Sequence, residues 1–180
     1  MVEYIIAEIL ELLTLVSGVA LLFLLVDYIL KKFKNRDLGG IWDSLSKNFI
    51  LFAFIVALIS TLGSLYYSDV LGYVPCVLCW WQRIFMYSQV LLFGTALVKG
   101  DRNVARYGLV FSLVGGFLAG VHSYLQGAVL ENGFCEAVGY SVSCTQNFGV
   151  SYGYITIPFM ALTAFVLIAG LCWNSRRRVD

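Results

Sequence analysis

Four cysteines and one isolated arginine carry the chemistry that this sequence suggests. Cys76 and Cys79 form a Cys-x-x-Cys motif, and Arg83 follows four residues later inside an apolar stretch. We expect the motif at a helix start, because Pro75 fixes the entry of the chain and an apolar run begins near Trp80. The dipole and free N–H groups of a helix start favour a thiolate. Because residues i and i+4 share a helix face, Arg83 adds a cation beside Cys79, and the pattern indicates a reactive sulfur.

A second cysteine pair, Cys135 and Cys144, encloses eight residues. Alone, such a pair predicts a structural staple on a loop. If it lies on the same membrane face as the Cys-x-x-Cys motif, it becomes the second half of a thiol–disulfide exchange pair. Four cysteines allow three connectivities, so their resting pairing stays open. A structural zinc site is the rival interpretation, but the C-x8-C spacing is long for zinc and we expect no metal.

The composition is that of an integral membrane protein. Of the 180 residues, 60% are hydrophobic and 13% are charged, whereas soluble domains are about 25% charged. The net charge is +1, and the basic residues form short clusters without a continuous stripe, so we expect no nucleic-acid partner.

The elements that must position the cysteines are transmembrane helices. A spanning helix needs about 20 mostly apolar residues, and four segments qualify. A fifth candidate, 5–30, is interrupted by Glu8, Glu11 and Asp27. The fold class is therefore all-α: a four-helix transmembrane bundle in 48–180, preceded by a hydrophobic helix and a basic cytoplasmic linker in 1–47. The four predicted spans are Asn48–Tyr67, Trp80–Val98, Tyr107–Gln126 and Tyr154–Trp173.

The basic residues orient these spans. Eleven of the twelve Lys and Arg residues fall within 31–47, 99–106 and 176–178. Placing all three clusters in the cytoplasm satisfies the positive-inside rule. The segments 68–79 and 127–153 then form outer loops, and each carries one cysteine pair. An oxidising outer compartment permits disulfides there.

The string Cys76-Val-Leu-Cys79-Trp-Trp-Gln-Arg83 resembles the disulfide bond formation protein B family (DsbB), and its short-loop branch in particular. The strings Thr61-Leu-Gly-Ser-Leu-Tyr66 and Tyr154-Ile-Thr-Ile-Pro158 extend the resemblance over about 48–173. It implies a four-helix membrane thiol oxidase of the bacterial cytoplasmic (inner) membrane, with its active site on the periplasmic side. Such an oxidase re-oxidises a thioredoxin-fold, DsbA-like donor protein and passes the electrons to ubiquinone or menaquinone.

The resemblance also implies residue roles. Cys76 and Cys79 would form the membrane-proximal disulfide, with Cys79 next to the quinone and Arg83 holding it. Cys135 would form the mixed disulfide with the partner, and Cys144 would exchange with Cys76.

Two further residues need separate interpretations. His122, the only histidine, is either a hydrogen-bonded packing residue or, as the resemblance implies, part of the quinone pocket. Cys172 is interpreted as an inert apolar residue. The segment before Asn48 departs from the family pattern, and it is expected to be a fifth span, a partner-binding helix or a fusion.

Other functions compete with the oxidase. A quinone-epoxide reductase of the vitamin K type also combines a Cys-x-x-Cys motif with a quinone, although the Arg83 spacing and the Trp-Trp-Gln string favour the oxidase. A non-enzymatic protein with two structural disulfides is the alternative from another class. A transporter is disfavoured, because ionisable residues are nearly absent from the spans.

Overall fold

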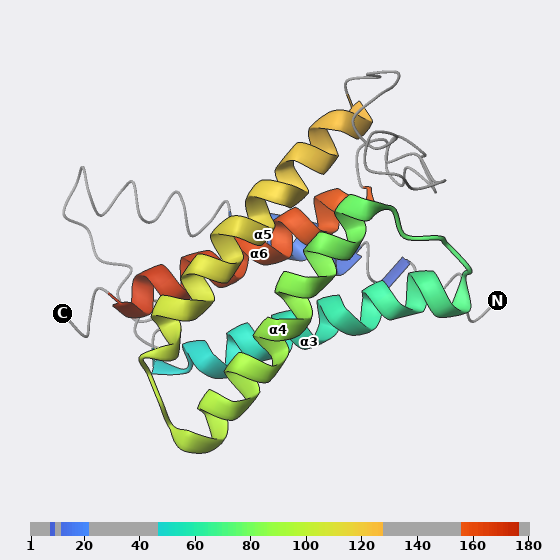
Figure 1. Ribbon diagram of the computed structural model, residues 1–180. Helices are drawn as coiled ribbons and strands as arrows, with labels where there is room; N and C mark the ends of the chain where they lie inside the picture. The colour runs from blue at the N-terminus through green and yellow to red at the C-terminus, as the bar shows by residue number, and fades with distance from the viewer. Residues whose placement is uncertain (1–7, 10–11, 22–46, 128–155, 177–180) are drawn as a thin grey trace, which may run out of the picture.

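The computed structural model describes residues 8–9, 12–21, 47–127 and 156–176, and these form helices and short connections (Figure 1). Cys135 and Cys144, most of the 1–47 segment and nearly all of the 127–153 loop lie outside the described residues. The helices are α3 (Phe49–Leu65), α4 (Val77–Lys99), α5 (Val104–Gly127) and α6 (Ile157–Arg176). A shorter apolar helix, Leu12–Leu21, is called the N-terminal helix below.

The four long helices pack as a bundle in which each helix has two main neighbours. α3 and α5 both pack against α4 and α6, whereas α4 and α6 barely touch. Among the described residues, three segments are long and apolar enough to cross a membrane: Phe49–Val70, Val104–Gln126 and Ile157–Arg176. α4 is of similar length at 23 residues, but Gln82, Arg83 and Gln89 make it more polar. The predicted all-α membrane bundle is confirmed.

The helix boundaries differ slightly from the predicted spans. α4 begins at Val77 instead of Trp80, because Cys76 caps it, and it ends where Gly100 adopts a left-handed conformation with φ 67°. Such a conformation suits glycine and is a common helix stop. α3 continues through a π-helical turn, Tyr66–Val70, so part of the predicted outer loop 68–79 is helical. Pro158 lies in the first turn of α6, as its missing N–H allows.

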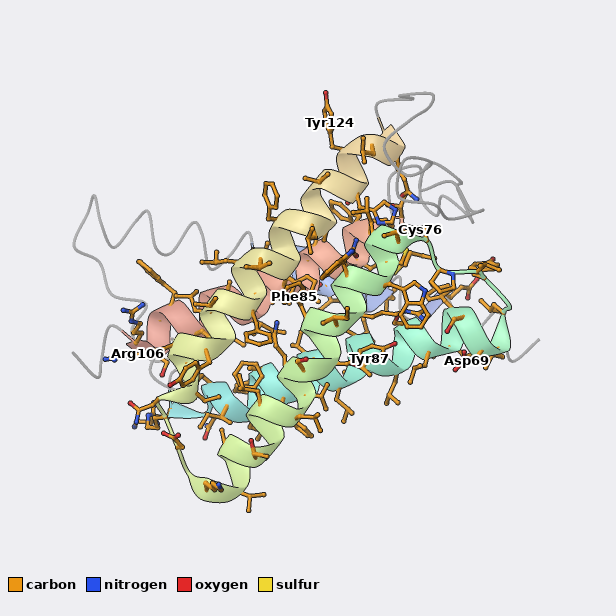
Figure 2. The ribbon with its side chains drawn as sticks, in the orientation of Figure 1. Asp69, Cys76, Phe85, Tyr87, Arg106 and Tyr124 are labelled. Carbon is orange, nitrogen blue, oxygen red and sulfur yellow. The ribbon has the colours of Figure 1, made fainter. Side chains whose placement is uncertain are left out.

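Charged residues gather at the end of the bundle opposite the Cys-x-x-Cys motif. Figure 2 shows Arg106 at one end and Cys76 at the other. Arg102 donates a hydrogen bond to the Lys47 carbonyl oxygen (3.3 Å) and lies 5.4 Å from the Phe49 ring centre. Two of the predicted basic clusters therefore meet in space, as the positive-inside assignment requires. We call this the basic end of the bundle.

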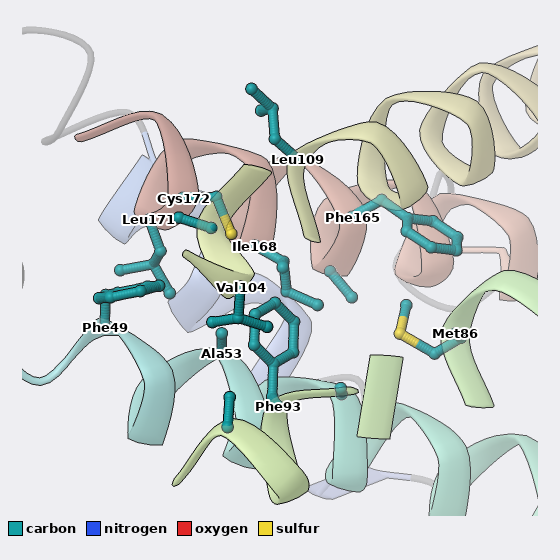
Figure 3. Close-up of a cluster of buried hydrophobic side chains, with 14 of the residues drawn as sticks. Phe49, Ala53, Met86, Phe93, Val104, Leu109, Phe165, Ile168, Leu171 and Cys172 are labelled. Atoms are coloured by element: carbon teal, nitrogen blue, oxygen red, sulfur yellow. The ribbon is translucent and has the colours of Figure 1, made fainter. Parts of the chain in front are cut away.

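The half of the bundle next to the basic end has a core of buried hydrophobic side chains (Figure 3). Its centre consists of fully buried side chains, among them Phe93, Phe165 and Cys172. Gly115 lies flat against the Phe165 ring, and a Cβ on Gly108 would approach the Phe93 ring to 2.5 Å. Glycine at these positions lets α5 pack closely on α4 and α6. Large apolar side chains such as Leu91 and Phe117 are about 70% exposed, which suits a lipid-facing surface.

Candidate functional site

Cys76 is the residue that caps α4. Its backbone is extended, with φ −74° and ψ 174°, and its sulfur accepts a hydrogen bond from the Cys79 backbone N–H (3.4 Å). The two Sγ atoms lie 3.3 Å apart, and both cysteines are free thiols. Cys76 is only 4% exposed, whereas Cys79 is half-buried. The structure thus places the motif at a helix N-terminus, where the sequence predicted it.

His122 reaches Cys76 from α5. Its Nε2 atom lies 3.7 Å from the Cys76 sulfur, and the imidazole is 1% exposed. On its other side, Nδ1 lies 3.0 Å from the side-chain amide nitrogen of Gln82. When that amide donates to Nδ1, the ring proton must sit on Nε2, which faces the sulfur. His122 is therefore a hydrogen-bonded residue beside Cys76, and its place in a quinone pocket stays a prediction.

These contacts set the charge of Cys76. The hydrogen bond from the Cys79 thiol makes the largest contribution to lowering the Cys76 pKa, and the bond and charge of His122 lower it further. Burial acts in the opposite direction, and the result is a Cys76 pKa of about 4. In the reduced protein the thiolate therefore belongs to Cys76. The sequence instead predicted a thiolate at Cys79. In the reduced pair, the hydrogen bond with Cys76, burial and the charge of Cys76 raise the Cys79 pKa, and the charge of Arg83 opposes them only weakly.

Arg83 ties α4 to α3 through Ser64. Its Nε donates to the Ser64 hydroxyl (2.9 Å) and its Nη2 to the Ser64 carbonyl oxygen (3.0 Å). The guanidinium also lies 5.4 Å from the Trp80 ring centre, within cation–π range. Ser64 thus fixes the position of a cation that would otherwise be costly in an apolar layer.

A cavity of about 260 Å³ joins these residues. It is close to the lower size of small-molecule pockets, about 300–1,000 Å³. Most of its wall is apolar, and a few polar groups converge on it, which is the usual character of a ligand site. Its lining includes the N-terminal helix, α3, α4, α5 and α6, and its polar members include Ser64, Cys79, Gln82, Arg83 and His122.

One group of side chains among the described residues has metal-ligand character. The sulfurs of Cys76 and Cys79 and a ring nitrogen of His122 all lie within 4.8 Å of one another. Two thiolates and an imidazole are donors that Zn²⁺ accepts. The sequence did not bring His122 into this group, because it lies 46 residues from Cys76 along the chain.

Two supporting residues escaped the sequence analysis. Gln82 was noted only as part of the Trp-Trp-Gln string, and Ser64 only as part of the string that begins at Thr61. A buried glutamine next to an arginine on a membrane helix could have drawn attention, because buried polar groups need partners. Nothing in the sequence indicates which residue on the other helices supplies that partner.

Comparison with known proteins gives a consistent result. Residues 46–174 match the family model described as Disulfide bond formation protein DsbB. The Disulfide bond formation protein C of Bacillus subtilis (strain 168) is 42% identical over 125 residues, which cover 68% of this chain and 90% of the relative. The Probable disulfide formation protein C of Halalkalibacterium halodurans is 43% identical over 122 residues, covering 68% and 88%. A prophage-derived disulfide bond formation protein B of Bacillus subtilis (strain 168) is 35% identical, covering 69% and 83%. No solved structure matches the chain significantly.

Proposed function

Because this chain belongs to the disulfide bond formation protein B family, we propose that it is a quinone-dependent thiol oxidase that re-oxidises a thioredoxin-fold donor protein. Disulfide formation by a multi-pass membrane protein follows from the family. The quinone, the DsbA-like partner, the inner-membrane location and the periplasmic orientation of the site are our proposal. A single observation carries it most strongly: the Cys76–Cys79 pair, Arg83 and His122 border one largely apolar cavity.

The cavity suits a quinone head group. A quinone has an apolar ring with two carbonyl oxygens, and it requires a few hydrogen-bond donors in an otherwise apolar wall. Arg83 supplies N–H groups, and the methyl and methylene groups of α3 and α6 supply the apolar wall. When bound, the quinone would accept two electrons and two protons. Cys79 would lie next to it, with Arg83 as the donor that orients it.

The exchange steps begin at the outer cysteines. A thiolate of the reduced partner attacks the Cys135–Cys144 disulfide and forms a mixed disulfide with Cys135, releasing Cys144. The second partner thiolate then displaces Cys135, so the partner leaves oxidised. Cys144 next attacks Cys76 in the Cys76–Cys79 disulfide, and Cys79 leaves as a thiolate that takes up a proton from water. Attack of Cys135 on Cys144 finally releases Cys76, which restores the outer disulfide and leaves Cys76 and Cys79 reduced.

The contacts of Cys76 would assist its release in that last step. A sulfur with a lowered pKa is a better leaving group, and the Cys79 thiol and His122 lower the pKa of Cys76. Gln82 would orient the imidazole for this purpose. The reduced pair then returns to the disulfide by giving up two electrons and the thiol proton, with His122 as the nearby group that can carry a proton.

The test is quinol formation by detergent-purified protein supplied with a reduced thioredoxin-like dithiol protein and excess quinone. We expect steady quinone consumption, followed by absorbance, that is lost in Cys79→Ser. Absence of quinol formation by the wild-type protein, with a partner that stays reduced, would contradict the proposal.

A further inference from the structure

The N-terminal helix lines the same cavity as the reactive cysteines. Leu13, Thr14 and Ser17 belong to the cavity wall together with Cys79 and Arg83. Ser17 lies four residues after Leu13 and three after Thr14, so it is a neighbour of both on the helix surface, and this helix turns one side toward the cavity. The family match begins at residue 46, so this part of the wall comes from outside the matched region.

The neighbouring walls come from α3 and α6. α3 contributes Val56, Ser60 and Gly63, which recur at helical spacing, and α6 contributes Met160 and Ala164. Three of these residues, Ser60, Gly63 and Ala164, are small, and the N-terminal helix closes the space that they leave. In Figure 1 this helix is the blue segment partly hidden behind α6.

Two hydroxyl groups in this wall bond to their own helices. The Ser17 hydroxyl donates to the Thr14 carbonyl oxygen (2.8 Å), and the Ser60 hydroxyl donates to the Val56 carbonyl oxygen (2.8 Å). With these donors already used, this part of the cavity presents mainly carbon to a ligand. Val56 precedes Ser64 by eight residues, about 12 Å along α3. The cavity therefore extends from the polar groups around Arg83 toward the basic end of the bundle.

We propose that the N-terminal helix is an added wall of the acceptor site that selects quinones by the size of their ring substituents and tail. This inference rests on the proposed quinone oxidase function. The helix contacts the apolar part of the cavity, while the cysteines, Arg83 and His122 act at the carbonyl end. Its residues should therefore affect acceptor use and leave exchange with the partner dithiol unchanged.

Ser17→Phe and Val19→Phe form a matched pair of variants. Ser17 lines the cavity, whereas Val19 on the same helix is 68% exposed. We expect Ser17→Phe to raise the quinone KM about tenfold or more, since small volume changes in apolar pockets are worth that much. The quinone KM of Val19→Phe should stay within about twofold of the wild-type value, because this side chain does not line the cavity. Thr14→Leu provides a second cavity variant if Ser17→Phe does not fold.

Each variant is measured for quinone KM, for partner KM and for the rate of partner oxidation in a single turnover. If both cavity variants have the same quinone KM as Val19→Phe, the proposed role of the N-terminal helix in quinone selection is wrong. Turnover by the wild-type protein would in that case still support the oxidase function. A wild-type protein that does not reduce quinone would overturn both. A rise in quinone KM with unchanged partner kinetics is the supporting result.

A second and independent observation concerns metal binding. The Cys76 sulfur lies 3.3 Å from the Cys79 sulfur and 3.7 Å from His122 Nε2. Zinc–sulfur and zinc–nitrogen bonds of about 2.3 and 2.0 Å require tetrahedral donors roughly 3.5–3.8 Å apart. Gln82 contacts the other ring nitrogen at 3.0 Å, as partners of metal-binding histidines commonly do. When the Gln82 amide rotates by about 180°, its carbonyl oxygen accepts from Nδ1–H and Nε2 is left free to bind a metal.

We infer that the reduced Cys76–Cys79 pair and His122 bind Zn²⁺ reversibly, with a fourth position open to the cavity. The disulfide form has no thiolates to offer, so the site would exist only in the reduced protein. Bound zinc would hold both thiolates and stop turnover. The inference does not depend on quinone, because it concerns the three side chains alone.

A chromophoric zinc indicator tests this directly. The protein used is Cys135→Ser/Cys144→Ser/Cys172→Ala, which keeps only the motif cysteines. We expect the reduced form to take about one equivalent of zinc from the indicator and the oxidised form to take none. His122→Ala should weaken binding by about tenfold or more. No zinc uptake by the reduced protein, or equal affinity in His122→Ala, would overturn the site.

Discussion

Two buried cysteines show how differently the two ends of this bundle are built. Cys172 is fully buried near the basic end, where it lies close to Gly108, and its surroundings are apolar. Cys76 is almost equally buried at the other end, but it contacts Cys79 and His122. Burial alone therefore does not make a cysteine inert; the neighbouring donors decide.

The same helices change character along their length. In the basic half, α4 and α6 contribute phenylalanine rings to a core that glycines on α5 allow to close. In the other half, α4 contributes Gln82 and Arg83, and the helices separate around a cavity. Between the two halves, the Ser112 hydroxyl donates to the side-chain oxygen Oε1 of the buried Gln89 (3.2 Å). Close packing stabilises one half, while the other half keeps polar groups and space for chemistry.

The largest expected effect separates the two cysteine environments. Cys76→Ser and Cys79→Ser should reduce quinone-linked turnover to background, because a hydroxyl cannot form the disulfide. Cys172→Ala should keep turnover near wild type. Quinol formation by purified variants measures this, and normal activity in Cys79→Ser would contradict the scheme.

A substitution in the hydrophobic core should lower stability instead of abolishing turnover. Phe93→Ala removes a fully buried ring and is expected to lower the free energy of unfolding by about 3–5 kcal/mol. Denaturant titration in detergent measures the loss. Leu91→Ala, at a position that is 72% exposed, serves as the control. A loss in Phe93→Ala no larger than the control would show that the basic half is not the stabilising half.

Arg83 tests how the site half is held together. Arg83→Met removes two hydrogen bonds to Ser64 and the proposed hydrogen bond to the quinone. Loss of the latter should raise the quinone KM by about tenfold or more, since hydrogen bonds of charged groups contribute about 1.5–3 kcal/mol. Partner exchange should remain. Ser64→Ala keeps the bond to the carbonyl oxygen and should have a smaller effect. If Arg83→Met instead unfolds the protein while quinone binding is retained, Arg83 is structural.

The reactivity of Cys76 should depend little on pH. Its pKa of about 4 lies well below the usual value of about 8.5, so the thiolate persists at all pH values above about 5. Alkylation of the reduced protein at Cys76, followed by mass spectrometry, should therefore stay constant from pH 8 to pH 6. An ordinary thiol would lose about tenfold per pH unit. Such a loss in the wild-type protein would contradict the hydrogen bonds described for Cys76.

The smallest expected effect is that of His122. His122→Ala removes one of two contacts that stabilise the Cys76 thiolate, while the Cys79 thiol remains. Turnover should slow modestly, and the Cys76 pKa should rise. Gln82→Leu should act in the same direction and more weakly, because it only loosens the imidazole. Unchanged turnover and an unchanged pKa in His122→Ala would return this residue to a packing role.

Much of the fold could be predicted because it depends on local properties. Apolar length predicted the four long helices, and the position of Pro75 predicted a helix start at the cysteine motif. The contacts of Gln82 with His122 and of Arg83 with Ser64 could not be predicted, because they depend on how each helix is rotated against its neighbours. The start of α4 at Val77 was also not predicted, because Cys76 caps this helix and cysteine is not a usual capping residue.

The central claim is that the Cys76–Cys79 end of the bundle is by itself sufficient for quinone reduction. The most direct measurement uses Cys135→Ser/Cys144→Ser protein, reduced with a small dithiol, freed of excess reagent and mixed with quinone. We predict the formation of one quinol per protein in a single turnover, with the Cys76–Cys79 disulfide as the protein product. Reduced thiols that persist beside unreacted quinone would contradict the claim.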